Sequence, residues 1–167
     1  MIRRIRRILR ILSTRRSPAP LSRPSSLALL LLALVAAGCT PERDDPFQVG
    51  SGEDEFEDVI GDEVDVISGD QGGQHIWISI RCRDCGPSGT VRFGVIDVKT
   101  GEPVTQEGLA AQVDLQREDE WLQVVGLTGF LDFGFGNLDG RQVRLWAEMD
   151  DDAGRTFRDE VEATADD

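Results

Sequence analysis

The fold is decided by one stretch, His75-Ile76-Trp77-Ile78-Ser79-Ile80-Arg81-Cys82. Its three isoleucines and Cys82 occupy every second position, and His75, Trp77, Ser79 and Arg81 fill the positions between them. A period of two belongs to a strand, because successive strand side chains point to opposite faces of a sheet. The stretch therefore predicts a strand that buries its isoleucine face.

The same period recurs on both sides of this stretch. Strong strand candidates are residues 91–96, 143–149 and 157–163, and weaker ones are residues 63–67, 112–115 and 121–126. Turn-forming segments rich in Gly, Pro and Asp separate them, at residues 69–73, 86–89, 99–102, 139–140 and 150–154. About seven short strands at roughly ten-residue spacing predict an all-β domain, an antiparallel sandwich over residues 63–167.

Two segments of this domain resemble known sequences. Residues 138–149, the acidic turn that ends at Gly154-Arg155, and residues 156–164 resemble the last two strands of many bacterial immunoglobulin-like domains. This resemblance implies an immunoglobulin-like sandwich. Residues 69–77 resemble a stretch in predicted lipoproteins of myxobacteria and their relatives. Neither resemblance implies an activity or a functional residue.

The N-terminal segment has the features of an export signal. Residues 1–26 contain eight arginines and no acid, and an apolar run follows at residues 27–37. Eleven residues form a helix of about 16 Å, which is too short for a hydrocarbon core of about 30 Å. We therefore expect a cleaved signal peptide over residues 1–38, with an uncleaved transmembrane anchor as the alternative.

The end of this segment resembles the lipobox of bacterial lipoprotein signal peptides, since small residues lead from the apolar run into Cys39. The resemblance implies cleavage before Cys39 and a diacylglyceryl thioether on its sulfur, commonly with a further N-acyl chain. Thr40 stands where an Asp would favour the inner membrane. The resemblance thus implies a lipid-anchored protein of the cell envelope, on the outer membrane of a Gram-negative bacterium.

The chain that would remain after cleavage is strongly acidic. All 31 acidic residues follow residue 38, but only 10 of the 18 basic ones do, so residues 39–167 carry a formal charge of −21. This charge excludes a nucleic-acid partner, because binding a phosphate backbone requires clustered Lys and Arg. Residues 39–62 are especially acidic and predict a disordered tether, with Phe56, Val59 and Ile60 docking as a first edge strand in the alternative.

Cys82 and Cys85 form a C-x-x-C motif at the end of the central strand. Zinc would need two further ligands, and His75 is the only histidine while Cys39 is assigned to the lipid, so we predict no metal site. A thioredoxin-like pair would lie at the start of a helix. The remaining interpretation is a structural disulfide between Cys82 and Cys85.

Two other features could bind a partner or an ion. His75 and Trp77 share the face opposite the isoleucines and form a possible binding patch, unless residues 130–135 cover them. The acidic turns at residues 137–140 and 150–152 lack the alternating acidic spacing of a calcium loop. They are expected to be solvated hairpin turns.

These observations predict a membrane-anchored lipoprotein that acts as a non-enzymatic structural or binding module. It would have no cofactor beyond the lipid on Cys39, and an envelope protein or glycan as its partner. Two alternatives stay open. One is an envelope thiol-redox or other enzyme that uses Cys82, Cys85 and His75, and the other is a calcium-dependent adhesion module.

Overall fold

The computed structural model describes residues 43–69, 73–106, 108–132 and 136–167. The predicted signal peptide, Cys39 and residues 40–42 lie outside this range. Within it, no helix has the length and apolar character needed to cross a membrane.

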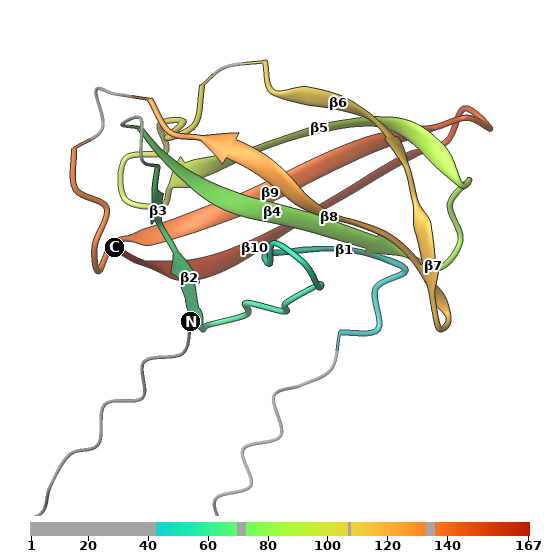
Figure 1. Ribbon diagram of the computed structural model, residues 1–167, viewed down its shortest axis with the longest axis horizontal. Coiled ribbons are helices and arrows are strands. Elements are labelled where there is room, and N and C mark those ends of the chain that lie inside the picture. Colours follow the sequence, from blue (N-terminus) through green and yellow to red (C-terminus); the bar gives the residue numbers. More distant parts are fainter. Residues whose placement is uncertain (1–42, 70–72, 107, 133–135) are drawn as a thin grey trace, which may run out of the picture. The chain divides into compact units, whose positions relative to one another are not determined.

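The described residues form ten strands in two sheets (Figure 1). The first sheet has the order β1 (Phe47–Gly50), β4 (Gln74–Cys82), β8 (Trp121–Phe130) and β7 (Gln116–Glu118), and β3 (Ile67–Ser68) pairs with the start of β4. The second has the order β2 (Glu63–Asp65), β10 (Thr156–Asp166), β9 (Gln142–Asp151), β5 (Ser88–Asp97) and β6 (Ala110–Asp114).

This architecture confirms the predicted all-β sandwich and refines it. The structure has more strands than the seven or so expected. Strands β1 and β7 are too short to show a clear period in the sequence, and the single strand expected at residues 63–67 is two strands, β2 in the second sheet and β3 in the first. The pairs are antiparallel except for β2 and β10, which run parallel over Glu63–Asp65 and Thr164–Asp166.

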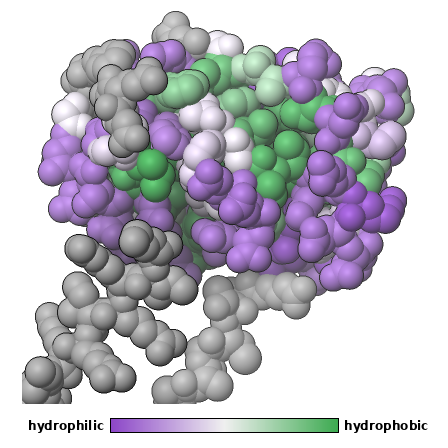
Figure 2. Space-filling view, in the orientation of Figure 1, coloured by the Kyte–Doolittle hydropathy of each residue, from purple (hydrophilic) through white to green (hydrophobic). Residues whose placement is uncertain are grey.

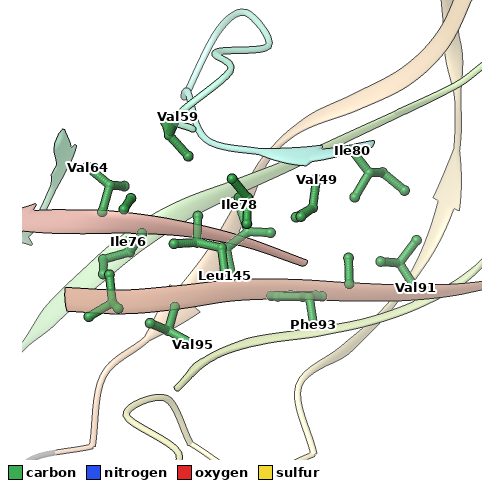
Figure 3. Close-up of a cluster of buried hydrophobic side chains, with 14 of the residues drawn as sticks. Val49, Val59, Val64, Ile76, Ile78, Ile80, Val91, Phe93, Val95 and Leu145 are labelled. Atoms are coloured by element: carbon green, nitrogen blue, oxygen red, sulfur yellow. The ribbon is translucent and has the colours of Figure 1, made fainter. Parts of the chain in front are cut away.

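The core lies between the two sheets and is centred on β4. Ile76, Ile78 and Ile80 are fully buried, as the alternation predicts, and Figure 3 shows Ile78 beside Leu145 of β9 and Ile80 near Val49 of β1. Fully burying a side chain of this size contributes about 1.5–3 kcal/mol. The strand that the sequence identifies most clearly is therefore also the centre of the apolar core.

Ser79 departs from the predicted alternation. It lies on the outer face of β4 but is fully buried, because the chain around Gly52 crosses over it. Its hydroxyl donates to Gly52 O at 2.9 Å and accepts from Gly126 N at 3.2 Å. The pairing of β4 with β8 shifts register at this point, between Ile78 and Ile80. Ser79 thus attaches a covering loop to the sheet.

The prediction of a tether over residues 39–62 is wrong from residue 43 onwards. Phe47 and Val49 are buried, and β1 pairs with β4 from Cys82 to Ser79. The first edge strand is therefore β1 and not the segment around Phe56. The acidic average composition of residues 39–62 does not reveal the four residues of β1. Their burial depends on β4 and on polar contacts with residues far along the chain. The compact unit begins at Arg43.

Candidate functional site

The structure places the predicted site residues at opposite ends of β4. His75 and Trp77 lie at its start, and Cys82 is its last residue. A strand rises about 3.3 Å per residue, so His75 and Cys82 are roughly 23 Å apart along β4. The structure does not bring His75 to the cysteines, and the two ends form separate candidate sites.

The cysteines lie where the chain passes from one sheet to the other, between β4 and β5. Both are free and buried, which differs from the predicted disulfide. The N–H of Cys85 donates to Cys82 Sγ at 3.0 Å. The Cys85 thiol also hydrogen-bonds Cys82, which lowers the pKa of Cys82 and, together with burial, raises the pKa of Cys85. The Cys85 thiol is thus the hydrogen-bond donor, and Cys82 Sγ is the acceptor.

Asp151 joins this turn to the turn between β9 and β10. Its Oδ2 accepts from the N–H of Gly86 at 2.9 Å and from Arg155 Nε at 2.9 Å. Its Oδ1 accepts from the N–H groups of Ala153 and Arg155, at 3.1 and 2.8 Å. Burial raises the pKa of Asp151, but the hydrogen bonds from Arg155 and Gly86 outweigh it and lower the pKa to about 2. We call Cys82, Cys85, Gly86, Asp151 and Arg155 the thiol corner.

The acidic turn at residues 150–152 is therefore only partly the solvated turn that the sequence predicts. Asp152 is exposed, whereas Asp151 is buried and accepts hydrogen bonds from the backbone of the turn. Both Asp151 oxygens are occupied by N–H donors, which leaves them poorly suited to a calcium ion. Among the described residues, no group of three or more His, Cys, Asp or Glu side chains is placed to hold a metal.

The predicted disulfide can be tested on the purified protein. We expect that protein kept under oxidising conditions has no free thiol at Cys82 or Cys85, because the two sulfurs already share a hydrogen bond and Cys82 has a lowered pKa. Alkylation of denatured protein, with and without reductant, followed by mass spectrometry measures this. Two alkylated thiols in the unreduced sample would show that the pair stays reduced and would reject the disulfide.

The other end of β4 carries an aromatic surface, formed by His75, Trp77 and Phe130. The His75 and Trp77 rings meet edge to face, with centroids 4.5 Å apart, and the Phe130 ring lies 6.3 Å from that of His75. Phe130 is 51% exposed, the one large apolar side chain so exposed in the described part of the chain. Figure 2 shows apolar side chains gathered across the middle of one face, with hydrophilic ones around them.

This surface agrees in part with the sequence-based expectation. His75 and Trp77 lie together on the outer face of β4, half-buried. The alternative, that residues 130–135 cover this patch, does not hold for Phe130, which stands beside His75 as its partner on β8. Residues 133–135 lie outside the described residues. Phe130 was missed as a surface residue because only the register of β8 against β4 places it there.

A second group that the sequence did not reveal lies further along the outer face of the same sheet. The Arg81 guanidinium stands 4.3 Å from the Phe56 ring centroid and 4.4 Å from that of Trp121, and Arg83 covers Trp121 at 4.1 Å. Arg81 Nε also donates to Gln48 Oε1 at 2.8 Å. The Arg81–Phe56 contact holds the covering loop against β4, and the Arg81–Gln48 hydrogen bond holds β1 there. A shallow cavity of about 290 Å³ opens beside this stack.

Comparison with known proteins adds no relative: no family model, curated protein or solved structure matches this chain. The fold and the two sites define an all-β sandwich domain with a buried thiol corner and an exposed aromatic surface. The resemblances to lipoprotein signals and to immunoglobulin-like domains stay predictions from the sequence.

Proposed function

We propose that this protein is a lipid-anchored lipoprotein of the bacterial cell envelope, on the outer membrane, and that it acts there as a non-enzymatic binding module. The anchor is supported by the arginine-rich start, the short apolar run and Cys39. The binding role is supported by one observation, the aromatic surface on which the exposed Phe130 stands beside the half-buried rings of His75 and Trp77.

Aromatic side chains of this kind favour a protein or glycan partner. They offer a large apolar area with few rotatable bonds, and the His75 ring adds nitrogens that can take part in hydrogen bonds. A single exposed apolar residue needs no explanation, but Phe130 lies against a half-buried histidine that itself packs on Trp77. The partner is therefore expected to place its own apolar or ring surface over Phe130.

The two alternatives have less support. A thiol-redox enzyme would need a reachable sulfur, yet Cys82 is fully buried and His75 lies at the other end of β4. A calcium-dependent adhesion module would need acidic turns with free oxygens, and those of Asp151 are already occupied. Neither alternative is favoured by a specific contact.

Anchoring predicts the behaviour of Cys39→Ser. The substitution removes the acceptor for the lipid, so we expect the protein to leave the membrane fraction, since acyl chains contribute about 0.8 kcal/mol per buried methylene. Sedimentation after a salt and carbonate wash, with metabolic labelling by a fatty acid, measures the change. Retention of the substituted protein on washed membranes would reject the lipid anchor.

Binding predicts site-specific crosslinking in intact envelopes. A photoreactive residue at position 130 should give a discrete adduct, and the same residue at position 158 should not, because Arg158 is exposed on β10 of the other sheet. The adduct at position 130 should fall several-fold when Trp77→Ser removes part of the aromatic surface. Identical adducts from positions 130 and 158 would contradict the proposal.

A further inference from the structure

Arg43, the first described residue, is clamped onto the domain by its side chain. Its Nη1 donates to Asp159 Oδ2 at 2.8 Å, its Nη2 to Val49 O at 2.6 Å, and its Nε to Asp58 Oδ2 at 3.3 Å. The side chain is only 10% exposed. A largely buried guanidinium that shares two carboxylates is held firmly, because withdrawing it would leave buried charges unpaired.

The backbone after Arg43 is held as well. The fully buried Gln48 donates from its amide to Arg43 O at 2.7 Å and to Asp45 O at 3.0 Å. The N–H of Val49 donates to Asp159 Oδ2 at 2.8 Å. Residues 43–46 therefore belong to the folded domain and do not lengthen the link between the domain and the residues before it.

Only residues 40–42 stand between Cys39 and Arg43. An extended chain advances at most about 3.6 Å per residue, so these four steps span at most about 14 Å. A domain of this size has a radius of gyration of about 14 Å. A lipid on Cys39 is thus tied to the domain by a link shorter than the domain is wide.

We infer that the domain is held directly at the lipid surface, with the edge that carries Arg43, Asp58 and Asp159 beside the phospholipid headgroups. This inference rests on the proposed lipidation of Cys39, and it names the surface that the domain meets there. The strand order β1-β4-β8-β7 puts β7 at the opposite edge of the first sheet. At about 4.8 Å per strand, β7 lies roughly 14 Å from β1 across the sheet.

Charge does not produce this contact. Residues 39–167 carry a formal charge of −21, which opposes adsorption on anionic lipids. The covalent link enforces it instead, so the proximity should persist when salt screens the charges.

Fluorescence quenching by the membrane tests the inference. The lipidated protein is reconstituted in phosphatidylcholine vesicles that contain a lipid with a nitroxide headgroup. A thiol-reactive fluorophore is placed at Asp45→Cys, in the clamped segment, or at Gln116→Cys on β7, both of which are exposed positions. The wild-type protein, treated with the same fluorophore, is the control for any labelling of the buried Cys82 and Cys85. We expect several-fold stronger quenching at position 45 than at position 116, in low and in high salt.

A matched variant lengthens the link and keeps the clamp. An insertion of about 20 Gly and Ser residues after residue 42 adds a root-mean-square span of about 25 Å. We expect it to reduce quenching at position 45 to the level of position 116. Equal quenching at position 45 with and without the insertion, in protein that floats with the vesicles, would overturn this inference alone. Protein that does not float with the vesicles would overturn the proposed lipid anchor, and this inference with it.

Discussion

Ile78→Asp is expected to unfold the domain. Ile78 is fully buried on β4, between the two sheets, and an aspartate there would place an unpaired carboxylate in the apolar core. Burying an unpartnered polar group costs several kcal/mol, and a charge costs more, against a typical stability of about 5–15 kcal/mol. Circular dichroism and thermal melting of residues 39–167 measure the loss.

Glu162→Gln is the matched control for this substitution. Glu162 is exposed on β10 and pairs with Arg144 at 2.6 Å. Exposed ion pairs contribute little to stability, so the melting temperature of the Glu162→Gln variant should stay close to that of the wild type. Similar melting temperatures for Ile78→Asp and Glu162→Gln would mean that the core does not lie on the isoleucine face of β4.

Asp151→Asn is expected to loosen the thiol corner and to lower the melting temperature strongly. An amide has one acceptor oxygen, and its NH₂ group would face either the donors that now bind Oδ2, Gly86 N and Arg155 Nε, or those that bind Oδ1, the N–H groups of Ala153 and Arg155. Asp152→Asn is the matched control, because Asp152 is exposed and accepts only from the Ser88 hydroxyl in the contacts described. Equal effects of the two substitutions would argue that Asp151 does not hold the corner.

The effect of Asp151→Asn should depend on pH in one direction. The pKa of Asp151 is about 2 in the folded protein and about 4 in an unfolded chain. Its stabilising contribution is therefore complete above pH of about 4 and is lost as the pH falls through about 2. Melting from pH 5 down to pH 2 should show the gap between wild type and variant closing. A gap that stays constant over this range would contradict the assignment.

The sequence predicts those parts of the fold that depend on local periodicity. The alternation in residues 75–82 identifies the central strand and its buried face, and both are confirmed. Strand β1 escapes such reasoning, because four residues are too few to show a period. Its burial also depends on Asp159, which lies 116 residues away from Arg43 in the chain.

The candidate sites show the same limit. The alternation places His75 and Trp77 on one face, but only the β4–β8 register brings Phe130 to them. Among three consecutive aspartates, nothing in the sequence distinguishes Asp151, which is buried by contacts with the distant turn at Gly86. Spacing alone likewise cannot tell that His75 and Cys82 stay apart, although both belong to one strand.

The Arg43 clamp also bears on self-association. An edge strand with free backbone groups can add a strand from another molecule and start aggregation. At Val49, the middle of β1, the outward N–H is taken by Asp159 and the outward carbonyl by Arg43. A second molecule therefore finds no free backbone donor or acceptor at Val49. The side chains of Arg43 and Asp159 thus prevent it from adding a strand to β1 at this residue.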